Sequence, residues 1–339
     1  MSGKKILIIR YKPLKYFIQC ISAFAAIRNF HKDDEITILT EKSLVKFCKR
    51  SRLFDKVWLD AMPDWFEVPG VIDIIKRLRA GKFDVVYDLQ NDKRSEWYFR
   101  LIGFRKPKWS SMVVKWCSYY YQPESYDVHY QELVNGQVKA AGIKAVPQID
   151  ISYMASNDGT NDLPERFVMI CSGGDKEKAP LKWDPVKYAE MIDSLFEKHG
   201  LQSVLVGDGG DDFWINNLVA QQCIKAKPIN YSGKTSINGI IDMAKRAVFC
   251  IGNETSPTHI AAYSGCKTIM ICSRFSPSEL IAPKVKNLVL IEEPMLEDVT
   301  TERVLKVIEE VALVDMDGKD FKIASQEELT MPEFLSNKS

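Results

Sequence analysis

The sequence of 339 residues lacks the features that would assign it to a membrane, secreted or metal-binding class. Its apolar run near the N-terminus, residues 6–9, is too short for a membrane span or a signal peptide. Its eight cysteines never form a Cys-x-x-Cys pair, so we interpret them as reduced, mostly buried thiols without metal or disulfide roles. We therefore expect a cytoplasmic protein.

The common nucleotide-binding signatures are missing too. There is neither a Gly-x-Gly-x-x-Gly motif nor a Gly-x-x-x-x-Gly-Lys-Ser/Thr motif, so a standard dinucleotide site or P-loop has little support. Internal repeats and low-complexity tracts are absent as well. The length suits two α/β domains, each with its own core, better than one very large domain.

The net charge of +1 conceals an uneven distribution. Residues 1–130 contain 24 Lys and Arg against 15 Asp and Glu, whereas the remainder contains 22 against 30. The first part is thus strongly basic. This pattern is compatible with a solvated basic face, or with a docking surface for an acidic acceptor or an anionic membrane.

Short β-rich runs alternate with amphipathic segments, which predicts parallel sheets with crossover helices. The expected strands are 5–10, 35–40, 56–59 and 84–89, then 167–171, 203–207, 248–252, 268–272 and 288–291. The expected helices are 15–30, 43–50, 71–80, 94–102 and 129–141, then 186–199, 213–223, 237–246, 257–264 and 301–311. The stretch 105–130, rich in aromatic and basic residues, is expected to be less regular.

The predicted fold is α/β, with two doubly wound, Rossmann-like domains. We expect a first domain over 1–155, a polar linker over 152–162, and a second domain over 163–315. The polar tail 316–339 is expected either to fray or to pack back on the first domain. In such folds ligands bind beyond the carboxyl ends of the strands.

Two turns after expected strands carry polar residues that could bind phosphate or ribose. Ser172-Gly173-Gly174 is followed by Lys178 and Lys182, and this combination favours a diphosphate site over a plain glycine turn. The acidic run 208–212 is more typical of a helix cap than of a ribose contact.

Two later segments follow strands of the second domain. Residues 232–236 suit loop capping and nucleotide contact equally well. The richest segment, 252–262, opens a helix with capping residues and a proline, but capping alone does not explain Glu254 and His259 together. A sugar or phosphate site is favoured there.

At this segment the chain resembles glycosyltransferase family 9, the ADP-heptose:lipopolysaccharide heptosyltransferases, whose usual form is Gly-Asn-Asp-Thr-Gly-Pro-x-His-Leu-Ala-Ala. The resemblance extends over nearly the whole chain, through residues 5–10, 87–90, 94–95, the helix near His129, 182–183 and 233–236. It implies a GT-B fold, a nucleotide-sugar donor bound to the second domain, and a lipid-linked acceptor on the first. It also implies inversion at the anomeric carbon, with neither metal nor cofactor.

The turn at 172–174 and this resemblance together predict the residues of the second domain that contact the donor. The set comprises Ser172, Gly173, Gly174, Lys178, Gly233, Thr235, Ser236, Asn238, Thr255, Ser256 and His259. By the resemblance, Glu254 lies with Thr255, Ser256 and His259 where the family holds the donor's sugar and phosphates. The family's Lys-x-Trp-Pro is Leu181-Lys182-Trp183-Asp184 here, so the lysine is displaced by one position. Lys182 or Lys178 would then offset the charge of the departing diphosphate.

The family's general base is an aspartate in Ile-Arg-x-x-x-Leu-Gly-Asp, a position that Tyr16 occupies in this chain. Tyrosine, with an ordinary pKa of about 10, is a poor base at neutral pH. Asp92, Asp88 and Glu254 are alternative bases.

The acceptor side is predicted from the basic first domain, with Lys12, Tyr16, Arg94 and Arg105 as contacts. The stretch 105–121 would recognise acidic or phosphorylated sugars, touch the inner membrane, or supply core aromatics. No nucleic-acid partner is expected. Two rival hypotheses are a catalytically silent nucleotide-sugar or glycan binder and a nucleotide-sugar epimerase.

Overall fold

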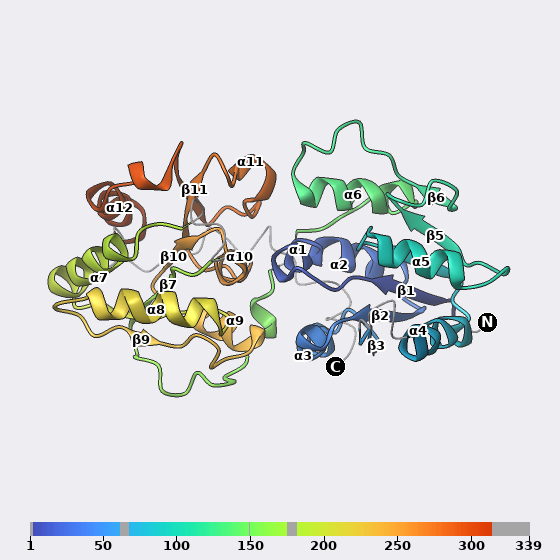
Figure 1. The fold of residues 1–339 in the computed structure, drawn as a ribbon, viewed down its shortest axis with the longest axis horizontal. Coiled ribbons are helices and arrows are strands. Elements are labelled where there is room, and N and C mark those ends of the chain that lie inside the picture. Colours follow the sequence, from blue (N-terminus) through green and yellow to red (C-terminus); the bar gives the residue numbers. More distant parts are fainter. Residues whose placement is uncertain (1–2, 62–67, 149, 175–181, 314–339) are drawn as a thin grey trace. The chain divides into compact units, whose positions relative to one another are not determined.

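The computed structural model describes residues 3–61, 68–148, 150–174 and 182–313, which form two compact units. The described part of the first unit ends at residue 148, and the second unit starts at residue 150. Each unit is a six-stranded parallel sheet with helices on both faces (Figure 1). The predicted α/β fold with two doubly wound units is confirmed.

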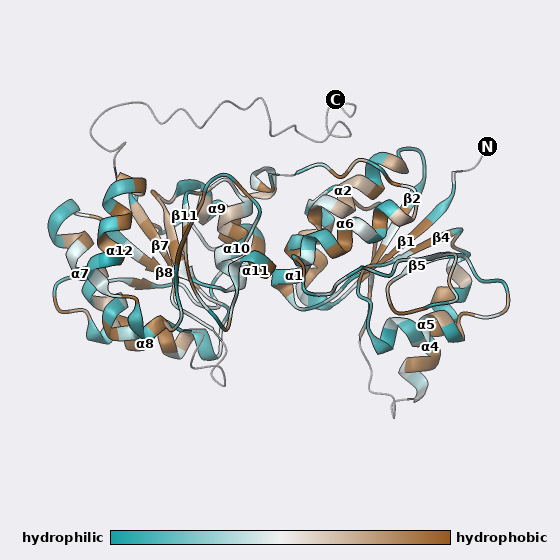
Figure 2. Cartoon of the chain, turned by 90° about the horizontal axis from the view of Figure 1, so that it is seen from above, coloured by the Kyte–Doolittle hydropathy of each residue, from teal (hydrophilic) through white to brown (hydrophobic). Residues whose placement is uncertain are grey.

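The first sheet has the strand order β3-β2-β1-β4-β5-β6. Its strands are β1 (Lys5–Ile9), β2 (Glu35–Thr40), β3 (Lys56–Leu59), β4 (Val85–Asp88), β5 (Lys108–Ser111) and β6 (Tyr119–Tyr120). Its helices are α1 (Leu14–Gln19), α2 (Ile21–Phe30), α3 (Val45–Arg50), α4 (Val68–Gly81), α5 (Lys93–Leu101) and α6 (Tyr130–Ala140). In Figure 2, α2 and α6 lie on one face of this sheet and α4 and α5 on the other.

The second sheet has the order β12-β11-β10-β7-β8-β9. Its strands are β7 (Phe167–Cys171), β8 (Gln202–Leu205), β9 (Ile229–Asn230), β10 (Cys250–Asn253), β11 (Thr268–Ser273) and β12 (Leu288–Glu293). Its helices are α7 (Pro185–His199), α8 (Asp211–Gln222), α9 (Ile237–Arg246), α10 (Ser256–Tyr263), α11 (Ser278–Ile281) and α12 (Thr301–Ile308).

Both sheets form because their central strands are apolar on both faces. In β1 the residues 6–9 are fully buried, and β7 is buried along its whole length. Parallel strands covered by helices on both sides require such continuous apolar runs, whereas half-exposed strands alternate. Figure 2 shows the resulting hydrophobic strands between helices whose outer faces are hydrophilic. Polar side chains are therefore concentrated at the ends of the strands.

The stretch 105–130 is more regular than its sequence suggests. It contains β5 and β6, which extend the first sheet in parallel register from β4. Trp109 lies on β5, is fully buried, and packs edge-on against Phe99 of α5 with ring centroids 5.2 Å apart. The short strands escaped prediction because serines follow the tryptophan and interrupt the apolar pattern.

Two further expectations fail in detail. The helix predicted over 15–30 is divided at Cys20 into α1 and α2, because the N–H of Cys20 bonds to the carbonyl of Phe17 in a tighter turn. The helix predicted over 301–311 ends at Ile308 and continues as a π-helical turn, Glu309–Leu313.

The segment 152–162, predicted to be a linker, is hydrogen-bonded to the second unit. Its contacts include Asn238 Nδ2 to the carbonyl of Met154 (2.9 Å) and Thr160 Oγ1 to Asp242 Oδ2 (2.6 Å). Its polar composition reflects these bonds. The tail predicted over 316–339 lies outside the described residues.

Candidate functional site

Polar side chains gather at the carboxyl ends of the strands in each unit, where α/β folds bind ligands. In the second unit, the backbone directly after β7 is held in an open turn. A side chain on Gly173 would overlap the carboxylate of Asp212, and the N–H of Gly174 donates to Asp212 Oδ1 at 3.0 Å. Only glycine fits at position 173 without displacing this carboxylate.

Lys182 lies beside this turn. The aliphatic stem of Lys182 is 3.4 Å from the place where a Gly174 side chain would begin. A glycine turn next to a lysine matches the arrangement predicted for a diphosphate. Lys178, the second predicted lysine, lies outside the described residues.

Asn253, at the end of β10, joins the surrounding segments. Its Nδ2 donates to the carbonyls of Ser172 (3.0 Å) and Gly173 (3.1 Å). Its Oδ1 accepts from the N–H of Trp183 (3.1 Å) and the hydroxyl of Tyr188 (3.0 Å). Sequence reasoning missed this residue, although a polar side chain at the end of a buried strand is itself a signal.

Glu254 and His259 form a buried pair at the start of α10. His259 Nε2 lies 2.8 Å from Glu254 Oε1, and the two side chains are 0% and 5% exposed. His259 Nδ1 has no hydrogen-bond partner among the described residues. The imidazole is too buried to meet a ligand directly, so its effect on a ligand would pass through Glu254.

The first turn of α10 also presents partly exposed hydroxyl residues. Thr255 is the N-cap but makes no capping bond with its side chain; its Oγ1 lies 3.0 Å from Thr258 Oγ1. Ser256 follows as the first helical residue. The backbone N–H groups of this turn are the kind of donors that bind phosphate at helix N-termini.

The predicted donor contacts at 233–238 engage the segment 154–158 instead. Thr235 Oγ1 donates to the carbonyl of Asp158 (2.6 Å), and Ser236 Oγ to Asp158 Oδ2 (3.2 Å). Asn238 is 2% exposed and bonded to Met154. Gly233 has φ +69° and faces Gly209. In these contacts the residues stabilise the loop, and donor contact stays a prediction.

The acidic run 208–212 does not cap α8, contrary to the sequence interpretation. Gly210 is the N-cap, and Asp212 accepts instead from the N–H of Asp208 (2.8 Å) as well as from Gly174. Asp212 adopts this arrangement because its carboxylate then accepts hydrogen bonds from the backbone of two turns, one after β7 and one after β8. Burial, followed by the charge of Asp212, raises the pKa of Asp208.

In the first unit, the loops after β1 and β4 are joined by hydrogen bonds. The hydroxyl of Tyr11 lies 2.8 Å from both carboxylate oxygens of Asp92, and the N–H of Tyr11 donates to Gln90 Oε1 at 3.0 Å. Asp92 is also the N-cap of α5, accepting from the N–H of Ser95 at 2.9 Å in a capping box. Asp92 remains partly exposed.

Asp88 is fully buried at the end of β4. It accepts from the N–H of Asn91 (3.0 Å) and from Ser111 Oγ (3.3 Å). Burial, which disfavours the charged form, raises the pKa of Asp88 to about 7. Such a carboxyl group can bind a proton near neutral pH, but it is not accessible to a substrate.

Arg10 follows β1 and is only 2% exposed. Its Nη1 donates to the carbonyl of Leu89 at 3.1 Å, while Nε and Nη2 have no partner among the described residues. Its guanidinium lies 5.4 Å from the centre of the Tyr130 ring. The buried guanidinium makes this edge of the first sheet more positive, because charges act over longer distances where water is excluded.

The side chain of Tyr16 packs against the ring of Tyr130. Its ring centroid lies 4.6 Å from that of Tyr130, and Lys15 Nζ is 5.2 Å from the Tyr16 ring. Lys12 is exposed, and its carbonyl accepts from Gln90 Nε2 at 3.1 Å. Lys12 thus lies in the loop after β1 and Tyr16 in α1, and their contact with an acceptor stays a prediction.

The two predicted arginines lie at opposite ends of the sheet. Arg94 is on the first turn of α5, where its Nη1 donates to the hydroxyl of Tyr98 at 3.3 Å; that hydroxyl donates to Asp60 Oδ2 at 2.5 Å. Arg105 lies in the loop that leads into β5, at the amino ends of the strands. The structure therefore does not bring Arg105 together with Lys12, Tyr16 and Arg94.

The described residues contain neither a metal-ion cluster nor a membrane-spanning helix. No group of three or more His, Cys, Asp or Glu side chains that could hold a metal ion occurs within them. None of the helices they form is long and apolar enough to cross a membrane.

Comparisons with known proteins identify what the chain is similar to. A family model described as glycosyltransferase family 9 (heptosyltransferase) matches residues 71–307. No curated protein matches the chain. Among solved structures, the glycosyl transferase family 9 protein of Veillonella parvula has 16% identity and a TM-score of 0.77, with 92% of this chain and 99% of that one covered.

Two E. coli structures are similar in the same way. The ADP-heptose LPS heptosyltransferase II has 16% identity and a TM-score of 0.76, covering 92% of this chain and 99% of its own. Heptosyltransferase WaaC with ADP has 17% identity and a TM-score of 0.73, covering 91% and 100%. These likenesses confirm the expected GT-B fold.

Asp88 should make folding stability depend on pH. Its pKa is about 7 in the folded chain and about 4 when unfolded, so its contribution is complete below pH 4 and is lost as pH rises toward 7. The loss is at most about 4 kcal/mol for a shift of this size. We expect Asp88→Asn to flatten the decline of the urea midpoint between pH 5 and pH 8.

The exposed Asp73→Asn on α4 is the control and should leave the decline unchanged. An undiminished pH dependence in Asp88→Asn would show that Asp88 is charged in the folded chain.

Proposed function

The chain belongs to glycosyltransferase family 9, and from this premise we propose that it transfers heptose or a related sugar from a nucleotide-diphosphate donor. The acceptor would be an acidic glycan, such as the core of lipopolysaccharide. The family match over residues 71–307 supports sugar transfer. The similar E. coli structures, of an ADP-heptose enzyme and of one with ADP, support a donor of this chemical class.

The observation that carries the donor assignment is the glycine turn beside Lys182. We infer that the diphosphate lies against the backbone of residues 172–174 and the first turn of α10. The helix N-terminus offers unpaired N–H groups and a partial positive charge. Lys182 would stabilise the negative charge that develops as the diphosphate leaves. Glu254, held by His259, would contact the sugar.

This arrangement offsets the leaving group's charge with a lysine and backbone donors. We propose on this basis that transfer needs neither a metal ion nor a cofactor and inverts the anomeric carbon in a single displacement. Turnover in the presence of EDTA would test the metal independence, and product analysis would test the inversion.

For the acceptor, the loops at the carboxyl edge of the first sheet provide the support. Arg10 is 2% exposed, so it would add positive charge beneath the surface rather than bind the acceptor directly. Lys12 and Arg94, at the same edge of the first sheet, would add positive charge. An acceptor that carries acidic or phosphorylated sugars would meet these needs.

Asp92 is our choice of general base. Asp88 is fully buried, Glu254 is engaged by His259, and Tyr16 packs on Tyr130. Asp92 is partly exposed, and its carboxylate lies at the carboxyl edge of the first sheet. It would accept the proton of the acceptor hydroxyl as that oxygen attacks the sugar.

We expect ADP to bind more tightly than UDP, GDP or CMP in a calorimetric titration, followed by turnover of the corresponding nucleotide sugar. Lys182→Met should weaken ADP binding by roughly tenfold or more, the worth of one charge-assisted hydrogen bond. Lys187→Met, on the neighbouring helix α7, is the control, because its ammonium bonds to the carbonyls of Glu297 and Val299.

Absence of nucleotide binding would refute the transferase. Selective binding without turnover, across acceptors, would instead support the silent binder that the replacement of the family's aspartate by Tyr16 favours.

Asp92→Asn should lower kcat by about 100-fold or more, the usual contribution of a general base. Asparagine is as good an N-cap as aspartate, so α5 should stay intact. Tyr16→Phe should change kcat by less than about threefold. A large loss in Tyr16→Phe together with little change in Asp92→Asn would assign proton transfer to position 16 and overturn the proposal.

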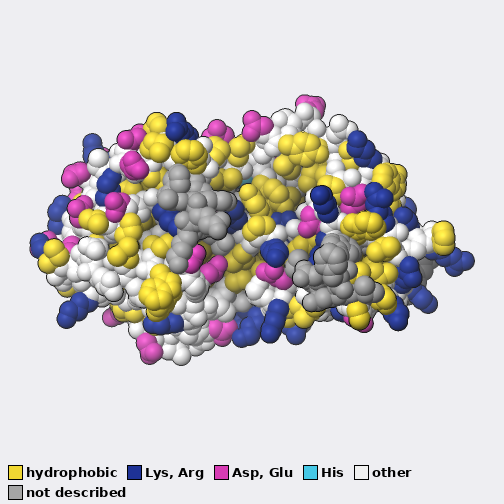
Figure 3. Space-filling view, in the orientation of Figure 1, with side chains coloured by type: hydrophobic (Ala, Val, Ile, Leu, Met, Phe, Trp, Pro, Cys, Tyr) yellow, Lys and Arg dark blue, Asp and Glu magenta, His cyan; other side chains and the backbone are white. Residues whose placement is uncertain are grey.

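The exposed side of α5 and the loops around β5 form a basic aromatic surface. We define it by Trp97, Arg100, Phe104, Arg105, Lys106, Lys108, Lys115 and Trp116. Within residues 93–121 there are seven Lys and Arg but one acidic residue. Figure 3 shows Lys, Arg and hydrophobic side chains intermingled over this end of the first unit.

The aromatics of this surface are exposed and in contact with cations. Phe104 is fully exposed, Trp116 is 61% exposed and Trp97 is 46% exposed. The guanidinium of Arg100 lies 5.1 Å from the Trp116 ring and 5.8 Å from the Trp97 ring. Tryptophan and basic side chains together suit the interface of an anionic membrane, where the ring enters the headgroup region.

We infer that this surface contacts the cytoplasmic face of the membrane that carries the acceptor. The protein should sediment with vesicles that contain phosphatidylglycerol but not with pure phosphatidylcholine. Changing Arg105, Lys106 and Lys108 to Gln should weaken this binding by roughly 100-fold, at about 1 kcal/mol per charge.

Changing Lys42, Lys46 and Lys49 to Gln removes the same charge from the region around α3 and is the matched control. An equal loss of binding in both triple variants would mean that net charge, rather than this surface, attracts the membrane.

A further inference from the structure

A cavity lies in the first unit, at the amino ends of the strands. It has a volume of about 250 Å³ and is lined by the starts of β1, β2 and β3, the last turn of α4, and Phe83. The acceptor groups proposed above follow the carboxyl ends of β1 and β4, at the opposite edge of the same sheet. This cavity, which we call the amino-edge pocket, is therefore distinct from the transferase site.

One wall of the amino-edge pocket is aromatic. The rings of Trp58 and Phe83 meet edge to face, with centroids 5.3 Å apart and planes 66° from parallel. Arg77 covers part of Trp58, its guanidinium 5.3 Å from the ring centre, and its Nη1 is fixed by the carbonyl of Leu59 at 3.0 Å. This wall offers apolar surface to a flat group.

The rim of the pocket is positively charged. Lys5, Lys56 and Arg77 line it together with a single carboxylate, Glu35, whose Oε2 lies 2.7 Å from Lys56 Nζ. The carboxyl end of α4 adds a partial negative charge of about one half. Three cations outweigh these two negative contributions, so the pocket attracts an anion.

The interior of the pocket contains a polar atom that lacks a partner. Thr37 is 1% exposed and lines the cavity, and its Oγ1 has no hydrogen-bond partner among the described residues. Leaving a buried hydroxyl unsatisfied costs about 1–3 kcal/mol. A ligand with an oxygen acceptor at this depth would satisfy the hydroxyl.

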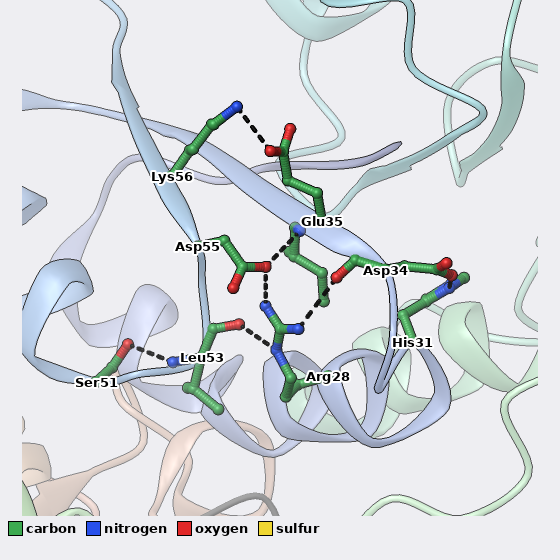
Figure 4. A network of polar contacts seen from close by, with 9 residues as sticks. Arg28, His31, Asp34, Glu35, Ser51, Leu53, Asp55 and Lys56 are labelled. Atoms are coloured by element: carbon green, nitrogen blue, oxygen red, sulfur yellow. Dashed lines mark hydrogen bonds and ion pairs between the residues drawn. The ribbon is translucent and has the colours of Figure 1, made fainter. Parts of the chain in front are cut away.

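A network of partly buried hydrogen bonds joins the starts of β2 and β3, as Figure 4 shows. Asp55 Oδ2 accepts from Arg28 Nη2 (2.6 Å) and from the N–H of Ile36 (2.8 Å), while Arg28 Nε donates to the carbonyl of Leu53 at 3.0 Å. These bonds hold the starts of β2 and β3, which carry Thr37 and Lys56. The pocket is consequently formed before any ligand arrives, which lowers the cost of binding.

We propose that the amino-edge pocket binds a small aromatic carboxylate. The ring lies against Trp58 and Phe83, and the carboxylate lies among Lys5, Lys56 and Arg77. One carboxylate oxygen accepts a hydrogen bond from the Thr37 hydroxyl. The volume is below the roughly 300–1,000 Å³ of pockets for drug-sized ligands, so the ligand is compact. This site is independent of the proposed sugar transfer.

Calorimetric titration of the full chain with benzoate tests the proposal. We expect saturable binding of one benzoate per chain, and at least tenfold weaker binding of benzamide, which lacks the charge, and of acetate, which lacks the ring. Equal binding of benzamide, equal binding of acetate, or no saturable binding of benzoate would each overturn it.

Variants distinguish binding of benzoate in this pocket from a general attraction of the anion to basic side chains. Lys56→Met should weaken benzoate binding at least fivefold, and Glu35→Gln should strengthen it because Lys56 is released from its ion pair. Thr37→Val, which keeps the shape but removes the hydroxyl, should weaken binding several-fold. Lys76→Met, at an exposed lysine of α4 that does not line the cavity, is the matched control and should change binding less than twofold.

A loss in Lys76→Met as large as in Lys56→Met would refute the site. If Thr37→Val does not fold, the opposite effects of Lys56→Met and Glu35→Gln decide the question, since both changes are at the partly exposed rim.

Discussion

The second unit depends on the side chain of Asn253. One amide at the end of a buried strand makes four hydrogen bonds, two to the turn after β7 and two to the segment that begins α7. Removal of this amide would leave buried carbonyls and a buried tyrosine hydroxyl without partners, at a cost of about 1–3 kcal/mol for each group. Asn253 therefore fixes the glycine turn. Through the N–H of Trp183 it also fixes the backbone next to Lys182.

The same constraint shapes the first unit. A parallel sheet covered on both faces leaves polar groups only at its edges, so the loops after neighbouring strands must satisfy one another. Tyr11 and Asp92 do this across the adjacent strands β1 and β4, and Asn91 continues the network to β5, where its Oδ1 accepts from the N–H of Met112 at 2.7 Å. The carboxylate of Asp92 is held in place by these hydrogen bonds. A group that accepts a proton from a bound molecule needs such a fixed position.

The sequence predicts the strands well because apolar β-rich runs must be buried, and it predicts single turns where small residues and lysines are neighbours, as at Gly174 and Lys182. It does not predict Asn253, whose partners are up to 81 residues away and follow no spacing rule. It also assigns Asp212 wrongly to the cap of α8. The same carboxylate can cap a nearby helix or bond to a distant turn, and in the structure it bonds to the turn at Gly174. The sequence does not predict β5 and β6, because these short strands are stabilised by pairing with the neighbouring strand rather than by an apolar pattern of their own.

Tyr16 and Arg10 share one aromatic neighbour in the first unit, the ring of Tyr130. The Tyr16 ring is tilted against it with centroids 4.6 Å apart, and the guanidinium of Arg10 lies 5.4 Å from its centre. A neutral aromatic at position 16 supplies no carboxylate to this cluster, and within the described residues Arg10 keeps two unpaired nitrogens. A buried guanidinium stays protonated, and the carbonyl of Leu89 and the face of the Tyr130 ring partly offset its charge. Position 16 thus contributes an aromatic contact at this edge of the sheet, where the partly exposed carboxylate of Asp92 also lies.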